Sequence, residues 1–149
     1  MKRLFYLLAA AAFTACGSAT TLSVMTVNMR YDNPEDGADN WRFRRGRVAE
    51  VIASHGVDVF GTQELLANQL GDLKRLLPGY AAVGVGREDG AEAGEFSAVF
   101  YRRDRFTPLE SGTFWLSETP DVAGSKGWDG ACERVATWVV LHDREGGRE

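Results

Sequence analysis

Hydrophobic and polar residues alternate over residues 21–29, where β-branched side chains are frequent, and this pattern predicts a β-strand. A second apolar run at residues 57–61 predicts another strand. Each run gives way to a residue with a side-chain oxygen, Asn28 for the first and Glu64 for the second. We therefore expect Asn28 and Glu64 to lie side by side at the tips of neighbouring strands.

Two amphipathic helices are predicted between and after these strands. Apolar residues recur at helical spacing over residues 41–55, with Asp39 or Asn40 as the N-cap and Gly56 at the C-terminal end. Leucines at helical spacing predict the second helix over residues 65–77, which ends before a Pro-Gly pair.

The second half of the chain is predicted to be mostly β-structure. Residues 134–142 form an apolar run on both faces, so we expect cover on both sides, one of them from the helix pair. The expected fold class is α/β (α+β), with one mixed β-sheet and helices on its outer face. Because the other cover is not apparent, we interpret the chain as the N-terminal part of a larger domain. The remaining predicted strands are at residues 80–85, 96–101, 106–109 and 112–116, and a long loop follows at 118–131.

Residues 1–19 are predicted to be a signal peptide, because two basic residues precede an apolar run that is too short to span a membrane. Cys16 lies in a context like a bacterial lipobox, so acylation of Cys16 would attach the protein to the membrane. Release by a peptidase at the small residues 17–19 is the alternative. Both alternatives predict an exported protein, either lipid-anchored to the cell envelope or periplasmic or secreted.

Composition and charge narrow the function classes. The chain is 44% hydrophobic and carries a net charge of −4, so nucleic acid is a possible partner but not a favoured one. Its two cysteines, one of them in the leader, cannot form a disulfide framework or a metal cluster. Arginines gather at 42–47 and 102–105, and we interpret both groups as solvated, charged surface.

The pair Asn28 and Glu64 has the chemistry of a magnesium site, because Mg²⁺ is held by few protein oxygens together with water and phosphate oxygens. The alternative is that Glu64 stabilises a helix N-terminus and Asn28 caps a strand end. Arg134, which opens the last predicted strand after a glycine-rich loop, is either a phosphate-binding residue or a surface residue.

Five segments resemble, in order and spacing, the endonuclease/exonuclease/phosphatase superfamily and its bacterial exported branch. These segments read MTVNMRYDN, FGTQE, EFSAVFYRRDRF, TFWLSETP and GSKGWDGACERVATWV. The resemblance covers essentially all of residues 22–149, so residues 20–149 are expected to be a truncated domain of this family. It implies the N-terminal part of a four-layer αββα sandwich. It also implies phosphoester hydrolysis by water, with Mg²⁺ or Mn²⁺ as the cofactor. Matched to the family's motifs, Glu64 is the metal-binding glutamate and Asn28 is the asparagine beside the metal and the scissile phosphate.

The chain also departs from the family pattern. Arg30 stands where the abasic-site endonucleases have an aspartate, which argues against a role in DNA repair. The family's Thr-His, Gly-Asp-x-Asn and terminal Asp-His segments have no match here, and His55 and His142 lie outside those motifs. We therefore expect a metal-dependent phosphodiesterase or phosphatase, monomeric, that acts on a phosphorylated small molecule or a phosphodiester, with this chain inactive alone. The competing hypothesis is a truncated, non-catalytic, lipid-anchored fragment or binding module.

Overall fold

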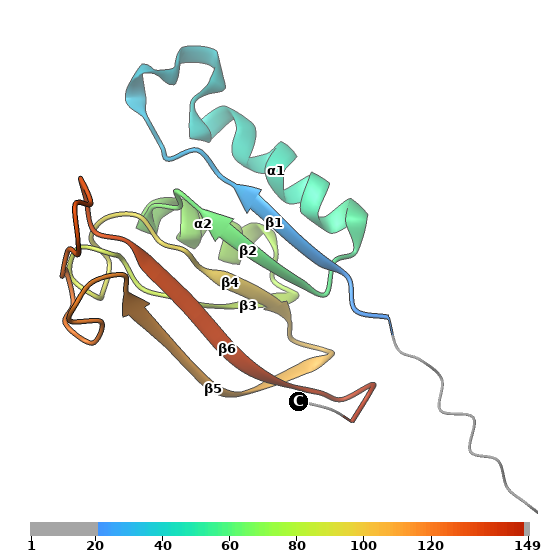
Figure 1. Cartoon of the computed structure of the whole chain (residues 1–149). Coiled ribbons are helices and arrows are strands. Elements are labelled where there is room, and N and C mark those ends of the chain that lie inside the picture. The colour runs from blue at the N-terminus through green and yellow to red at the C-terminus, as the bar shows by residue number, and fades with distance from the viewer. Residues whose placement is uncertain (1–20, 148–149) are drawn as a thin grey trace, which may run out of the picture.

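The computed structural model describes residues 21–147, which form a layered α+β domain (Figure 1). The predicted leader at 1–19, with Cys16, lies outside the described residues. Between residues 21 and 147, neither helix has the length and hydropathy that a membrane-spanning helix requires.

The first sheet brings together strands that are far apart in the chain. Its order is β1-β2-β4-β3, and β1 and β2 are parallel while the other neighbours are antiparallel. The predicted mixed sheet is therefore confirmed. Its strands are β1 (Val24–Asn28), β2 (Val59–Gln63), β3 (Tyr80–Val83) and β4 (Val99–Arg102).

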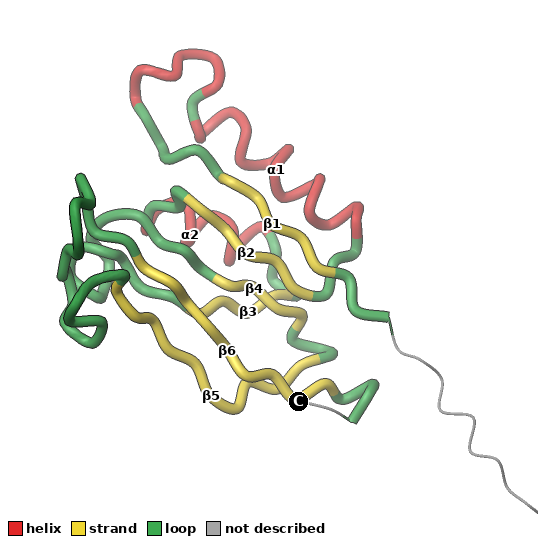
Figure 2. The backbone as a smooth tube through the Cα atoms, viewed as in Figure 1, coloured by secondary structure: helices red, strands yellow, loops and turns green. Residues whose placement is uncertain are grey.

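Helices α1 (Trp41–His55) and α2 (Ala67–Leu76) cover one face of this sheet (Figure 2). The predicted bounds of α1 are confirmed. The Asn40 side chain accepts a hydrogen bond from the Arg42 N–H as the N-cap, and Gly56 ends the helix with a φ of 54°. A 3-10 helix, η1 (Pro34–Asp39), occupies part of the segment before α1, where the sequence predicted only a loop.

The hydrophobic core lies between the helices and the first sheet. Phe60 of β2 and Phe100 of β4 are buried and stack with ring centroids 4.5 Å apart. Trp41 and Ile52 of α1 and Leu73 of α2 pack against them in the same buried cluster. Burial of these large apolar side chains fixes the helices on the sheet and so fixes where β1 and β2 end.

The last strand departs from the expectation that the helix pair covers one of its faces. β6 (Val135–Asp143) pairs with β5 (Phe106–Trp115) in a separate two-stranded sheet on the other side of the first sheet from the helices. Gly84 permits this close approach, because a Cβ there would lie 3.0 Å from Ala98 Cα and 3.5 Å from Thr137 Oγ1 of β6. The helix pair therefore does not cover β6, and the described layers are helices, mixed sheet and second sheet.

β5 is one strand where the sequence predicted two. The pairing with β6 shifts register between Pro108 and Glu110, which is a β-bulge. The bulge accommodates Leu109 as an extra residue and tolerates Pro108, which has no N–H to donate, without ending the strand.

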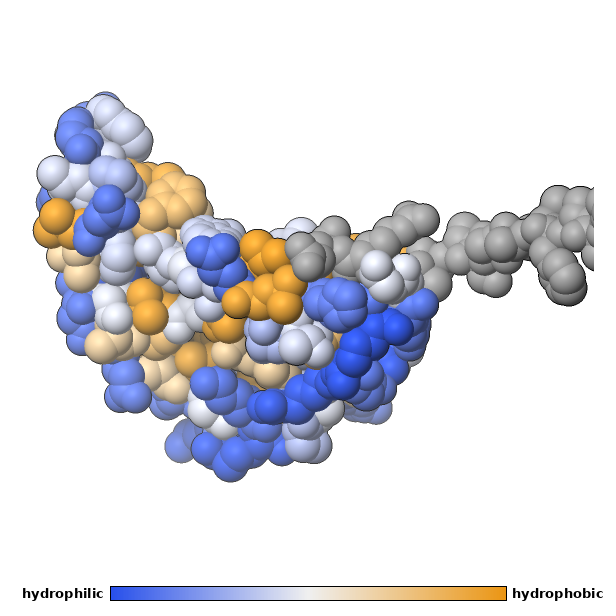
Figure 3. All heavy atoms as spheres, turned by 90° about the horizontal axis from the view of Figure 1, so that it is seen from below, coloured by the Kyte–Doolittle hydropathy of each residue, from blue (hydrophilic) through white to orange (hydrophobic). Residues whose placement is uncertain are grey.

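The second sheet leaves part of its apolar surface exposed. Seen from below, the molecule shows several groups of hydrophobic residues on one face, with hydrophilic residues mostly along its lower and right-hand edges (Figure 3). The exposed apolar side chains of β5, β6 and the residue after β5 are Leu109, Phe114, Leu116 and Trp138.

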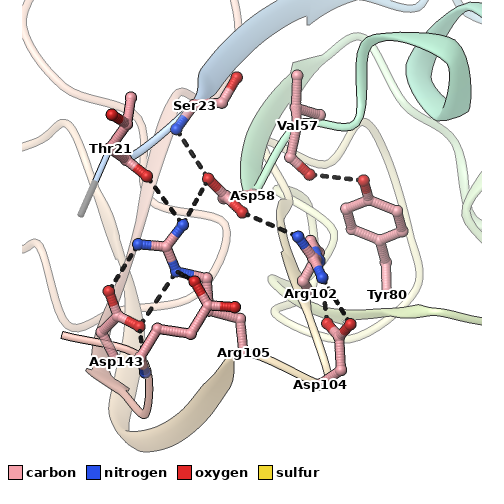
Figure 4. Close-up of polar contacts among 10 residues, drawn as sticks. Thr21, Ser23, Val57, Asp58, Tyr80, Arg102, Asp104, Arg105 and Asp143 are labelled. Carbon is pink, nitrogen blue, oxygen red and sulfur yellow. Dashed lines mark hydrogen bonds and ion pairs between the residues drawn. The ribbon is translucent and has the colours of Figure 1, made fainter. Parts of the chain in front are cut away.

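One arginine of the predicted solvated group is buried. Arg105 is only 4% exposed, and its guanidinium contacts Asp58 at 2.8 Å and Asp143 at 2.7 Å (Figure 4). It also donates to the carbonyl oxygen of Thr21. The surface interpretation is wrong for Arg105, because this residue joins the chain before β1, the start of β2 and the end of β6.

Candidate active site

Asn28 and Glu64 meet where β1 and β2 end. The parallel register pairs Asn28 with Gln63, so Glu64 follows directly beyond the tip of β2. The Asn28 Nδ2 donates a hydrogen bond of 2.9 Å to Glu64 Oε1. The proximity expected from the sequence is therefore observed.

Both strand tips turn sharply after these residues. Arg30 has a φ of 52° and Glu64 a φ of 55°, a left-handed conformation that is uncommon for residues other than glycine. Such conformations cost free energy and persist only where the surrounding contacts hold them.

Gln69 supplies such contacts from inside α2. Its side chain is fully buried, and its Oε1 accepts hydrogen bonds from the N–H groups of Asp32, at 3.2 Å, and Leu66, at 3.0 Å. Its Nε2 donates to the carbonyl oxygen of Arg30 at 3.0 Å. One amide thus ties the segment after Asn28 to the segment after Glu64. The sequence did not predict this role for Gln69, since a lone glutamine in a helix gives no signal of its partners.

Replacing Gln69 with leucine is expected to destabilise the protein by about 2 kcal/mol, because the partly buried N–H groups of Asp32 and Leu66 lose their acceptor and the Arg30 carbonyl loses its donor. Affinity for Mn²⁺ should fall about tenfold as the two strand tips loosen. Urea unfolding and Mn²⁺ titration check the two effects. Asn68→Ala is the matched control, since this neighbouring amide is exposed and bonds only a side chain. Equal stability of the two variants would contradict the assigned role.

The Arg30 side chain contacts η1 and forms no hydrogen bond or ion pair with Asn28 or Glu64. Its guanidinium forms two hydrogen bonds to Asp36, at 3.0 and 3.1 Å, and this contact holds the pKa of Asp36 below its ordinary value. The Arg30 N–H donates to Asn28 Oδ1 at 2.8 Å, which orients the asparagine amide with its nitrogen toward Glu64.

A cavity of about 210 Å³ opens beside the Asn28–Glu64 pair. All three site residues predicted within the described chain, Asn28, Glu64 and Arg134, lie in its wall. Figure 1 shows why, since β1, β2 and β5 all run to this end of the molecule and β6 starts there. The wall consists of Asn28, Gln63, Glu64, Arg87, Glu95, Ser97, Glu133, Arg134 and Val135.

Arg134 is exposed and stands at the residue before β6. Among residues 21–147, no hydrogen bond or ion pair holds its guanidinium. The structure thus places Arg134 in the cavity wall with its charge available to a ligand.

The cavity wall contains a second arginine, Arg87, which was not predicted from the sequence. Arg87 forms an ion pair of 2.7 Å with Glu95, and its carbonyl oxygen accepts a hydrogen bond from Trp115 Nε1. The two charged residues flank a tight glycine-rich turn, in which the Arg87 N–H also donates to the Glu95 carbonyl. Opposite charges on either side of such a turn were the available signal.

The residues present fit a divalent cation bound through one carboxylate. Glu64 Oε2 makes no hydrogen bond to any residue between 21 and 147, so it is available as a ligand. In that part of the chain there is no group of three or more His, Cys, Asp or Glu side chains that could hold a metal. A single protein carboxylate suits Mg²⁺, which keeps several water ligands and often binds substrate phosphates. Asn28 as a direct ligand stays a prediction.

Comparison with known proteins gives the same family that the sequence segments resemble. The sequence model described as "Endonuclease/Exonuclease/phosphatase family" matches residues 25–147. A search of curated proteins found no match.

Solved structures match over most of the chain. An endonuclease/exonuclease/phosphatase from Bacteroides vulgatus is 47% identical, with a TM-score of 0.81, over 85% of this chain and 48% of its own. A mannosyl-6-phosphatase from Bacteroides thetaiotaomicron is 46% identical, with a TM-score of 0.83, over 85% of this chain and 48% of its own. A functionally unknown conserved protein from Enterococcus faecalis is 30% identical, with a TM-score of 0.74, over 83% and 47%. The chain thus spans about half the length of these structures.

Proposed function

Because the chain belongs to the endonuclease/exonuclease/phosphatase family, we propose that it contributes the metal-binding half of a phosphoester hydrolase. In this proposal, water attacks the phosphorus in line with the leaving oxygen. The observation that carries the proposal is the contact between Asn28 and Glu64 in the wall of a cavity that also contains Arg134.

Three residues of the cavity wall have a definite part in this proposal. Glu64 holds the cation, Mg²⁺ or Mn²⁺, and Asn28 orients the Glu64 carboxylate through its Nδ2. Arg134 binds a non-bridging phosphoryl oxygen, for which a guanidinium provides two parallel donors. When bound, the cation supplies Lewis-acid polarisation of the phosphoryl group and stabilises charge on the leaving oxygen.

The group that activates water lies elsewhere in this proposal. His55 is on α1, with its Nδ1 at 2.8 Å from the Val51 carbonyl oxygen, and His142 pairs with Thr107 in the second sheet. Neither histidine is in the cavity wall. We therefore propose that residues 21–147 alone show little turnover, since general base catalysis contributes about 10²–10⁴-fold to such reactions.

A phosphorylated sugar is the substrate class we propose first. The support is a relative, 46% identical over 85% of this chain, whose name is mannosyl-6-phosphatase. The net charge of −4 also disfavours a long polyanion. Export by the leader at 1–19, anchoring through Cys16 and a monomeric state complete the proposal.

The full-length protein, meaning the whole domain of which we interpret this chain as the N-terminal part, should release phosphate from hexose phosphates when Mg²⁺ is present. It should lose this activity in EDTA and recover it when Mn²⁺ is added. A malachite-green phosphate assay over a panel of sugar phosphates, nucleotides and phosphodiesters measures it. Absence of divalent-dependent hydrolysis across the panel would reject the hydrolase and favour a non-catalytic binding module.

A further inference from the structure

The Arg87 guanidinium binds Glu95 through Nη1, whereas its Nε–Nη2 edge has no hydrogen-bond acceptor among residues 21–147. Nη1 contacts Glu95 Oε2 at 2.7 Å, whereas no other hydrogen bond of this guanidinium exists among residues 21–147. Nε is closed to solvent and has no partner. The edge formed by Nε and Nη2 is therefore a pair of parallel donors without an acceptor.

A buried donor without an acceptor is rare in folded proteins and needs an explanation. The side chain is only 17% exposed, so water satisfies little of it. Its backbone is nevertheless held firmly, by the Trp115 Nε1 hydrogen bond to the Arg87 carbonyl and by the Arg87 N–H bond to Glu95. The free edge thus belongs to a side chain whose backbone is held in place beside the cavity.

The charges of the cavity wall indicate what this edge could bind. The wall contains the two arginines Arg87 and Arg134 and the three glutamates Glu64, Glu95 and Glu133, which leaves one net negative charge. A divalent cation on Glu64 would reverse the sign of the net charge. An anion should therefore enter together with the cation, and a phosphoryl group carries the paired oxygens that match an arginine fork.

We propose that Arg87 is a second phosphate-binding residue, which pairs its free Nε–Nη2 edge with non-bridging oxygens of the phosphoryl group held at Glu64. The guanidinium turns about its contact with Glu95 when the phosphoryl group binds, and this turn gives Nε its acceptor. The identity of the ligand rests on the proposed function, whereas the choice of Arg87 as the binding residue rests on the contacts of its own side chain.

The test measures the binding of inorganic phosphate to the full-length protein by calorimetry with saturating Mg²⁺. Arg87→Lys keeps the charge and removes the fork, so the dissociation constant should rise about tenfold, and Arg87→Met should raise it about a hundredfold. KM for the sugar phosphate should rise more than kcat falls in Arg87→Lys. Arg103→Met is the matched control, because that arginine is exposed and, among residues 21–147, its side chain hydrogen-bonds only the Tyr80 carbonyl oxygen.

Glu95→Gln separates ligand binding from a merely structural ion pair. If Arg87 served only to pair with Glu95, loss of either partner would weaken phosphate binding alike. In the binding role, Glu95→Gln removes a negative charge from the wall, so phosphate should bind equally well or more tightly. Weaker binding in Glu95→Gln, to the extent seen in Arg87→Met, would overturn the proposal.

The outcomes distinguish this inference from the proposed function. A wild-type protein that binds phosphate through Arg87 but hydrolyses no phosphoester would reject the hydrolase and keep Arg87 as an anion-binding residue. If the wild-type protein is active and both Arg87→Lys and Arg87→Met bind phosphate as tightly as the wild type, the inference is rejected and the hydrolase is kept.

Discussion

Glu64→Gln in the full-length protein is expected to lower kcat/KM about 10²–10³-fold, which corresponds to roughly 3–4 kcal/mol of lost transition-state stabilisation. Glutamine keeps an oxygen that can accept the hydrogen bond from Asn28 Nδ2, so the local geometry should survive. What is lost is the negative charge that, in the proposed function, would hold the cation. The Mg²⁺ concentration for half-maximal activity should therefore rise. Initial rates across a Mg²⁺ titration measure both effects.

Glu50→Gln is the matched control for this experiment. Glu50 is an exposed residue of α1, so the same loss of charge there should leave the rate and its Mg²⁺ dependence unchanged. If Glu64→Gln retained wild-type kinetics and metal dependence, Glu64 would have no role in metal binding. The alternative of a carboxylate that only stabilises the start of a helix would then hold.

Arg105→Met is expected to reduce the free energy of unfolding by about 3–5 kcal/mol, the usual cost of leaving a buried charge without its partner. The variant leaves Asp58, itself 5% exposed, with the 3.3 Å ion pair to Arg102 and the hydrogen bond from the Ser23 N–H. It also releases Asp143 at the end of β6, and so loosens the second sheet from the first. Because whole domains are stable by about 5–15 kcal/mol, this is a large fraction of the total. Urea unfolding at neutral pH measures it.

Arg103→Met provides the control, because this arginine is two residues away but exposed. Its loss should cost much less, in line with other surface arginines. Equal destabilisation by the two variants would mean that the burial of Arg105 contributes nothing particular to stability.

Acid should remove the same interaction. The Arg105 guanidinium hydrogen-bonds to Asp143 and lowers the pKa of that carboxyl to about 2. An unfolded aspartate has a pKa of about 3.9. The contribution of Asp143 is therefore fully present above about pH 4 and is lost as the pH falls toward 2. The free energy of unfolding, measured in urea at several pH values in this window, should fall less steeply with decreasing pH for Arg105→Met than for the wild type.

Local features of the fold could be predicted because their causes are local. The bounds of α1 follow from Asn40, whose side chain caps the N-terminus, and from Gly56, which adopts a positive φ at the C-terminus. The closeness of Asn28 and Glu64 also followed from the sequence. Two apolar strands joined by a helix pair in parallel, so the residues after them meet at one edge of the sheet.

The charged contacts could not be predicted in the same way. A run of arginines at 102–105 is typical of a solvated surface, and nothing in it marks Arg105 as the one that is buried. Its partners lie 47 and 38 residues away in the chain, at Asp58 and Asp143. Gln69 likewise reaches Arg30 across 39 residues. Contacts at such separations depend on how the layers pack.

The sequence by itself determined the two α-helices, most of the strands, and the pairing of an amide with a carboxylate at the tips of β1 and β2. Only the tertiary structure decided that β5 and β6 form a second sheet, because a strand that is apolar on both faces does not specify which layers cover it. That packing brings the start of β6 and the turn after β3 to the same cavity as Glu64, and thereby places Arg87 and Arg134 beside it. The physical reason is that hydrophobic burial is non-directional. The apolar pattern of the sequence therefore determines which residues are buried, whereas the packing of the layers determines which residues come into contact.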